Sequence, residues 1–115
     1  MAKAKNFDFE LIKENGLSII AENGIECKNS VSLPMIDDEN GEEIGQATAI
    51  YDGLAVICAV NEEIFAQATS KQKQVIAEKF LMLKPASVIE IDGKKYKVCE
   101  VKEFGGGFVA LIQAA

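Results

Sequence analysis

The stretch that decides the fold is IEIDGKKYKVCEVKEFGGGFVALIQ, residues 89–113. Apolar and polar residues alternate around Asp92 and Gly93, a pair that suits a two-residue hairpin turn because both positions tolerate positive φ. Three consecutive glycines, residues 105–107, then lead into a run of apolar residues. This pattern predicts a three-stranded antiparallel meander at the end of the chain. Its expected strands are residues 87–91, 95–102 and 108–112.

The upstream part of the chain predicts one helix and further strands. Residues 6–16 carry apolar side chains at helical spacing, with Asn6 or Asp8 as a cap and Gly16 as the stop. An Asn-Gly pair at 23–24 and an Asp-Gly pair at 52–53 each predict a hairpin turn. The expected strands here are residues 17–21, 25–33, 48–51, 54–60 and 80–83. The chain is therefore predicted to be mostly β (α+β), a small antiparallel β-barrel or sandwich with a short N-terminal helix.

Residues 61–79 have a different character from the strands around them. Their middle is polar, and apolar side chains flank it on both sides. The pattern fits either an amphipathic helix or a long protruding loop that becomes ordered against a partner. The candidate assembly interface comprises Ile64, Phe65, Val75 and Ile76.

Length and composition place the chain among single-domain globular proteins. It has 115 residues, of which 49% are hydrophobic and 26% are charged, so we expect one domain with one core. Its apolar runs are too short for a membrane span, and the N-terminal lysines precede no apolar stretch typical of a signal peptide. The three cysteines are widely spaced and unpaired, which favours free thiols. We therefore expect a protein made in the cytoplasm, without membrane contact.

The absent residue types restrict the possible functions. The sequence contains no histidine and no tryptophan, and all 12 basic residues are lysine. Histidine is the usual general base and metal ligand, while arginine makes the forked contacts that recognise phosphate and guanine. The net charge of −6 also disfavours nucleic-acid binding. The charge is uneven along the chain, at −7 for residues 1–60 and +1 for residues 61–115. Such a bipolar subunit suits stacking on other copies.

Two motifs invite ligand hypotheses that their context does not support. Residues 37–43, DDENGEE, hold five carboxylates. With Gly41 at the sixth position of a calcium loop, however, the first ligand would be Ile36, so a solvated acidic loop is favoured. Residues 105–110 match G-x-G-x-x-A, but a dinucleotide site needs a helix after the glycines, and strand-forming residues follow here. We predict no cofactor, no metal and no catalytic residues.

One family resemblance rests on the C-terminal half of the chain. Residues 86–98, ASVIEIDGKKYKV, are followed by Val101 and the first glycines of the 105–107 run, and residues 49–52 read AIYD. This pattern resembles the small head–tail connector proteins of tailed bacteriophages and prophages, the head-closure or attachment group. The resemblance covers roughly the last 70 residues. Where that family commonly has Gly-Asp, this chain has Ala86 and Ser87.

The resemblance implies a non-enzymatic structural protein of a phage or prophage virion. Copies of such proteins form a ring at the head–tail junction, and their partners are one another, portal or adaptor proteins and tail proteins. The implied location is the host cytoplasm during assembly and then the virion. A tail-terminator ring is an alternative that the sequence does not separate from a head-closure ring.

Two other classes remain as alternatives to a ring-forming subunit. A small β-barrel binding module of OB or SH3 type, for a peptide or single-stranded nucleic acid, would use an aromatic residue with lysines around it, such as Tyr96. An enzyme would need carboxylates or lysines in a cleft. The absence of arginine and histidine makes both less favoured than a structural subunit.

Overall fold

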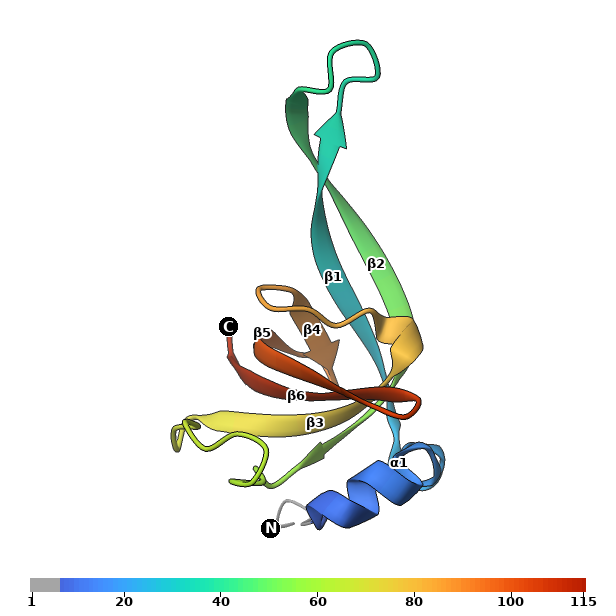
Figure 1. The fold of residues 1–115 in the computed structure, drawn as a ribbon, viewed down its shortest axis with the longest axis vertical. Helices are drawn as coiled ribbons and strands as arrows, with labels where there is room; N and C mark the ends of the chain where they lie inside the picture. Colours follow the sequence, from blue (N-terminus) through green and yellow to red (C-terminus); the bar gives the residue numbers. More distant parts are fainter. Residues whose placement is uncertain (1–6) are drawn as a thin grey trace.

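The computed structural model describes residues 7–115, which form a closed β-barrel with one helix beside it (Figure 1). The strands follow one another around the barrel in the order β1-β2-β3-β6-β5-β4, and every neighbouring pair is antiparallel. The elements are α1 Phe9–Asn23, β1 Ile25–Ile36, β2 Glu43–Cys58, β3 Gln72–Glu78, the 3₁₀ turn η1 Lys79–Leu81, β4 Val88–Ile91, β5 Lys94–Phe104 and β6 Gly107–Ala114. The predicted fold class, a small antiparallel β-barrel with a short N-terminal helix, is confirmed.

The C-terminal meander forms as its sequence predicts. Strands β4, β5 and β6 are consecutive neighbours in the barrel. Asp92 and Gly93 join the first two of them with φ values of 52° and 78°, the left-handed conformations that a tight hairpin turn requires. A register shift between Val98 and Glu100 lets β5 bend around the barrel.

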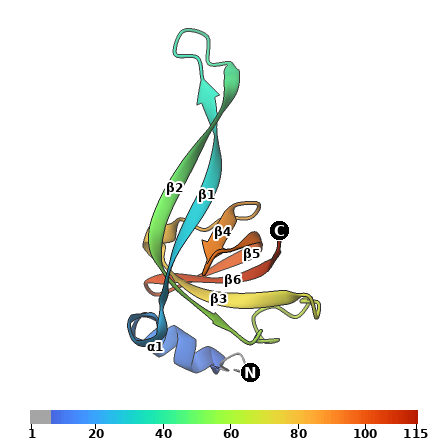
Figure 2. The ribbon, with the colours of Figure 1, turned by 180° about the vertical axis from the view of Figure 1, so that it is seen from behind.

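Two apolar clusters lie on opposite sides of the barrel wall. The first fills the barrel interior and includes Ile89, Val98 and Phe108. The second lies between the outer wall and α1, and includes Ile12, Phe65 and Ile76. Helix α1 therefore covers one outer face of the barrel, at the end away from the β1–β2 hairpin (Figures 1 and 2).

The helix is longer than the sequence predicts. Within the described residues, the expected helix at 6–16 and strand at 17–21 form one helix, Phe9–Asn23, with a kink at Asn15. Of the two expected caps, Asn6 lies outside the described residues and Asp8 stands at the N-cap position. Gly16 does not end the helix, because this glycine is the contact point with the barrel: a Cβ there would collide with the Phe104 ring. The predicted hairpin at residues 23–24 is likewise absent, since Gly24 has extended backbone angles and leads directly into β1.

Residues 61–79 do not form a single helix or a protruding loop. Residues 61–71 make a series of turns that fold back over the barrel wall, and Gln72–Glu78 form β3 between β2 and β6. The strand has apolar side chains on both faces, because its inner face lines the barrel and its outer face packs under α1. The strand expected at 80–83 is the η1 turn instead.

A polar network fixes this returning segment to the barrel. The fully buried Gln74 accepts a hydrogen bond from the Asn61 backbone N–H at 2.9 Å and donates one to Asn61 Oδ1 at 2.7 Å. Asn61 in turn donates to the backbone carbonyl of Phe7 at 2.7 Å. Each buried polar atom of this network has a partner, so the network ties together β3, the turns after β2 and the start of the helical region.

The network predicts a specific loss of stability. Replacing Gln74 by leucine conserves volume but leaves the Asn61 groups without partners, so the free energy of unfolding should fall by about 2 kcal/mol. Urea denaturation measures this change. The matched control is Gln113→Leu on the exposed end of β6, which should change stability by less than about 0.5 kcal/mol. Equal effects of the two substitutions would contradict the role given to Gln74.

Candidate functional site

The β1–β2 hairpin extends far beyond the barrel and forms a projecting arm, defined here as residues 31–50 (Figure 1). Strand β4 pairs with β1 only from Cys27 to Ser30, and β3 pairs with β2 only from Ala55 onward. Beyond these points the two strands pair only with each other, so both outer edges carry unpaired backbone groups. The arm gives the molecule its elongated shape, 51 × 27 × 27 Å.

The two faces of the arm differ in polarity. One face of the arm is the side of β1 and β2 that lines the barrel interior nearer the base. It carries the cross-strand pairs Val31 with Ala49 and Leu33 with Ala47, followed by Met35. We call this the apolar face. The opposite face is more polar and carries the Lys28–Asp52 ion pair at 3.1 Å at its base and Ser32 donating to Gln46 Oε1 at 2.7 Å. It also carries one large apolar side chain, Ile50, which is 61% exposed. The apolar face is buried at Val31 and becomes exposed from Leu33 outward.

The base of the arm is fixed by polar contacts with the η1 turn. Asn29, fully buried on the inner side of β1, donates to the Leu81 carbonyl at 2.9 Å. The backbone N–H of Leu54 donates to Glu78 Oε1 at 2.7 Å. Asn29 Oδ1 has no hydrogen-bond partner. These contacts hold both strands against η1 where they leave the barrel.

The expected hairpin turn at residues 52–53 is wrong, because β2 continues straight through Asp52 and Gly53. Gly53 faces the η1 turn, and a Cβ there would lie 2.9 Å from Leu81 Cγ. The glycine is thus needed for close packing against Leu81. Without a turn at this point, residues 43–51 extend the strand into the arm.

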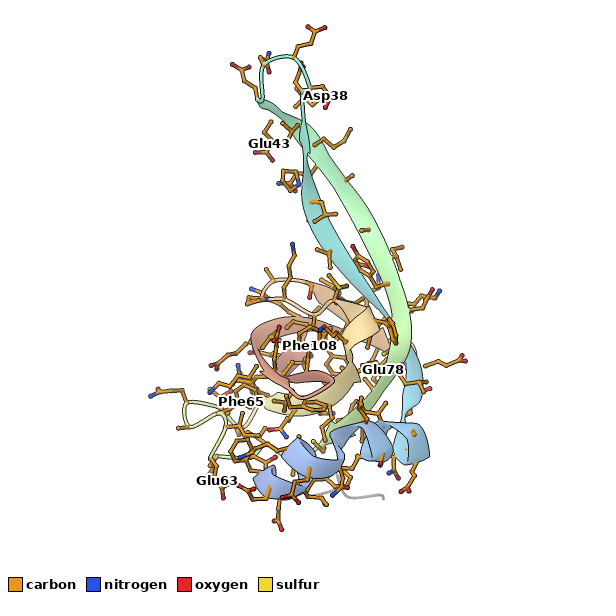
Figure 3. The ribbon with its side chains drawn as sticks, turned by 45° about the vertical axis from the view of Figure 1, so that its right-hand side comes forward. Asp38, Glu43, Glu63, Phe65, Glu78 and Phe108 are labelled. Atoms are coloured by element: carbon orange, nitrogen blue, oxygen red, sulfur yellow. The ribbon has the colours of Figure 1, made fainter. Side chains whose placement is uncertain are left out.

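The acidic segment forms the tip of the arm, where Figure 3 shows Asp38 and Glu43. It is an ordered turn, in which the Asp37 N–H donates to the Glu42 carbonyl and the Gly41 N–H donates to the Asp37 carbonyl, both at 2.8 Å. Gly41 has a φ of 73°. Among residues 7–115, no three acidic, cysteine or histidine side chains are placed to hold a metal ion. The five carboxylates of DDENGEE make up the acidic tip.

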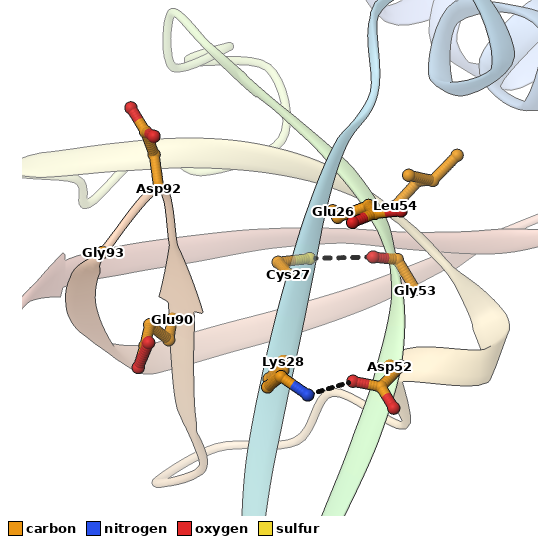
Figure 4. Close-up of a pocket in the computed structure, with 9 residues that line it drawn as sticks. All are labelled: Glu26, Cys27, Lys28, Asp52, Gly53, Leu54, Glu90, Asp92 and Gly93. Atoms are coloured by element: carbon orange, nitrogen blue, oxygen red, sulfur yellow. Dashed lines mark hydrogen bonds and ion pairs between the residues drawn. The ribbon is translucent and has the colours of Figure 1, made fainter.

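A groove of about 690 Å³ lies on the outer wall at the base of the arm, across β4, β1 and β2 (Figure 4). Its charged residues are Glu26, Lys28, Asp52, Glu90 and Asp92. The lining thiol of Cys27 is 3.4 Å from the Gly53 carbonyl. Burial, together with the negative charges of Glu78 and Asp52, raises its pKa to about 11. The thiol is therefore a poor nucleophile at neutral pH. Because four of the five charged residues that line it are acidic, the groove is an acidic surface.

A second pocket of about 400 Å³ lies at the barrel end where β3 and β5 begin and β6 ends. Four lysines surround it, and Tyr96 and Ala114 complete its lining. We call it the lysine end, with Lys71, Lys73, Lys94 and Lys95. Lys73 Nζ lies 5.8 Å from the centre of the Tyr96 ring.

The four residues expected to form an assembly interface lie inside the fold. Ile64, Phe65, Val75 and Ile76 are each no more than 5% exposed. Three of them pack between α1 and the barrel, while Val75 lines the barrel interior. Lys102 donates to the Ile64 carbonyl at 2.8 Å and covers the Phe65 ring at 5.6 Å. These side chains stabilise the subunit and offer no free surface in this fold.

The projecting element is thus the arm, which the sequence reasoning divided into separate strands. Its signal was present in the alternation of residues 30–35 and 46–51 on either side of the acidic turn. No helix in residues 7–115 is long and apolar enough to cross a membrane. Neither a protein-family model nor a curated protein matches the chain.

The arm is predicted to be dispensable for folding of the barrel. Replacing residues 33–47 by Asn-Gly removes mainly exposed side chains and leaves every barrel ladder in place. The shortened protein should unfold cooperatively, with a change in stability below about 1 kcal/mol. Urea denaturation followed by circular dichroism measures this. In contrast, Val31→Asp places a charge in the buried base and should be strongly destabilising. A shortened chain that does not fold would contradict this division of roles.

The cysteines are predicted to differ in reactivity. Burial raises the pKa of Cys58 to about 11, although the Gln74 amide opposes the shift in part by donating to its sulfur at 3.3 Å. Because the thiolate is the reactive form and only about one thousandth of each buried thiol is ionised at pH 8, labelling of both should be slow there and should speed up as the pH approaches 11. Native iodoacetamide labelling at pH 8 should modify the half-buried Cys99 first. In urea all three should react, and rapid native labelling of Cys58 would contradict this prediction.

Proposed function

We propose that this protein is a non-enzymatic structural subunit that assembles with copies of itself through the projecting arm. The observation that carries the proposal is the arm's exposed apolar face together with its two unpaired strand edges. A two-stranded hairpin is at best marginally stable in water by itself, and open edges are templates for pairing with another chain. An arm with these properties is best explained by a partner that covers it.

The exposed apolar side chains are too large and too close together to be incidental. Met35 is 47% exposed on the apolar face, Ile36 is 51% exposed on the opposite face and Ile44 is 63% exposed, and all three lie just below the acidic tip. Scattered single apolar residues on a surface need no explanation, but a contiguous group marks an interaction site. The ladders of the barrel close on themselves, whereas both strands of the arm have long open edges, so the arm is the favoured point of contact.

The finer proposal is a ring at the head–tail junction of a phage or prophage virion. It is supported by the resemblance of the C-terminal half to head-closure proteins and by the shape of the subunit, a rigid barrel with one projecting arm. A contact between an arm and a different surface of the next subunit is heterologous, and such contacts close into rings when the rotation permits. The proposed partners are other copies, portal or adaptor proteins and tail proteins, and a tail-terminator ring would use the same geometry.

A binding module for single-stranded nucleic acid is the second candidate, favoured by the lysine end. Base stacking needs an accessible aromatic face, and Tyr96, the aromatic residue of that pocket, is only 6% exposed. Fluorescence anisotropy with single-stranded oligonucleotides at low salt tests this alternative. Tight binding would favour it over the structural subunit.

Assembly through the arm is tested by adding one charge to either of its faces. Leu33→Glu puts a carboxylate on the exposed apolar face, and Thr48→Glu puts the same charge on the opposite face as the matched control. Leu33→Glu should weaken self-association at least about ten-fold, because burying an unpaired charge is costly. Thr48→Glu should have a much smaller effect. Sedimentation velocity and electron microscopy at high concentration measure the assembly.

A wild-type protein that stays monomeric at all concentrations would argue against a self-assembling subunit. The virion role has its own test, which is disruption of the gene in its phage or prophage. Filled heads and separate tails should then accumulate. Normal virions made without the protein would contradict the connector role and leave the assembly result unaffected.

A further inference from the structure

The lysine end gathers four lysines, none of which forms an ion pair within residues 7–115, although Glu90 lies across from Lys95 in the β4–β5 ladder. The ion pairs formed within residues 7–115 are Lys13–Glu10 and Lys28–Asp52, and neither involves the four lysines of this pocket. Unpaired like charges in a confined space repel one another, so an anion that enters the pocket relieves the repulsion. The pocket is also partly apolar, since Tyr96 and Ala114 line it.

The acidic tip, at the far end of the arm, has the opposite charge (Figure 1). None of its carboxylates forms an ion pair within residues 7–115. The Asp37 carboxylate accepts a hydrogen bond from the Glu39 N–H at 2.8 Å, and Asn40 Oδ1 accepts one from the Glu42 N–H at 2.9 Å. The turn is thus held by its own backbone, and the remaining carboxylates are presented on a preformed support.

We propose that the acidic tip of one copy docks in the lysine end of the next copy. This inference rests on the proposed function and specifies its interface. In this contact five carboxylates face four lysines, and the exposed Met35, Ile36 and Ile44 below the tip lie against Ala114 and the aliphatic stems of the lysines. The contact therefore combines charge complementarity with burial of apolar surface, the usual composition of a specific interface.

The contact has to be between molecules. The arm points away from the barrel, while the start of β3 and the C-terminus lie at the side of the barrel well below the tip (Figures 1 and 2). A strand rises about 3.3 Å per residue, so the arm carries its tip about 20 Å beyond the barrel. The tip and the lysine end are different surfaces, and repeating their contact produces a head-to-tail series of subunits.

A second copy is favoured over the other possible occupants of the lysine end. A nucleic acid would lack both an aromatic face to stack on and an arginine to grip its phosphates. The tip supplies five carboxylates for the four lysines. Because every copy carries both surfaces, the tip and the lysine end are always present at equal concentration. Charge complementarity of this kind mainly sets orientation and specificity, which a ring of identical subunits requires.

Carbodiimide cross-linking tests the contact directly, because the reagent joins a carboxylate to a lysine amine only when the two are in contact. In the wild-type protein, mass spectrometry should find intermolecular links between a peptide containing residues 37–43 and one containing Lys71, Lys73, Lys94 or Lys95. Raising the salt from about 0.05 to about 0.5 M should reduce these links, because exposed charges are screened. Links from the tip to other lysines alone would overturn the proposal.

Charge reversal provides the second arm of the experiment. Asp38→Lys with Glu39→Lys reverses part of the tip, and Lys94→Glu with Lys95→Glu reverses part of the lysine end. Each pair should weaken self-association at least about ten-fold. A 1:1 combination of the two variants should restore association as dimers, because the unchanged tip of one variant can dock in the unchanged lysine end of the other. The matched control is Lys79→Glu with Lys84→Glu, two exposed lysines outside the pocket, which should leave self-association unchanged.

The outcomes separate this inference from the proposed function. If the wild-type protein assembles but neither reversal weakens assembly, the subunits join through another surface, and only the tip-to-lysine contact is rejected. If both reversals weaken assembly and their combination does not restore it, the contact is likewise rejected. If the wild-type protein neither assembles nor cross-links, both proposals fall. An oligonucleotide that binds tightly and depends on Lys94 and Lys95 would also overturn the contact in favour of nucleic acid.

Discussion

The constraint on which the structure depends is the unequal length of neighbouring strands. The barrel closes through the short ladder between β4 and residues 27–30 of β1. Strands β1 and β2 continue past this ladder and past the end of β3, while no other strand follows them. Two paired strands that extend beyond their neighbours have no further strand to pair with, so they leave the barrel as a hairpin with two open edges. The closed barrel and the projecting arm are therefore two consequences of the same pairing.

The barrel can support such an arm because its own wall is closed and covered. Strand β3 lies between β2 and β6 and is buried on both faces, with α1 and the turns of residues 61–71 over its outer side. The Gln74–Asn61 network holds this cover in place. At the other end, Asn29 and Glu78 tie the departing strands to the η1 turn. Partner binding to the arm can thus proceed without rearranging the core.

The sequence predicts the elements whose signals are local and misses those that depend on distant contacts. The meander follows from alternation and from Asp92 and Gly93, whose turn needs nothing beyond the two strands it joins. The local sequence around Gly16 and Gly53, however, predicts a break at each, although each glycine allows close packing against a residue far along the chain, Phe104 or Leu81. Gln74 was assigned to a polar segment because its buried partner, Asn61, lies 13 residues earlier. The position of the arm could be inferred only once the strand was known to pass through Gly53.

The arm also carries features that limit its contacts with other arms. Its tip bears five negative charges, so two tips repel each other, and the same repulsion opposes parallel stacking of arms side by side. Pro34 removes one backbone donor from β1, which weakens that edge as a template for a further strand. Exposed apolar residues would otherwise favour indiscriminate association, and charges near an open edge are a common protection against it. An acidic tip above exposed apolar side chains is complementary to a positively charged surface, and among residues 7–115 the lysine end is such a surface, which is why the proposed contact joins these two regions.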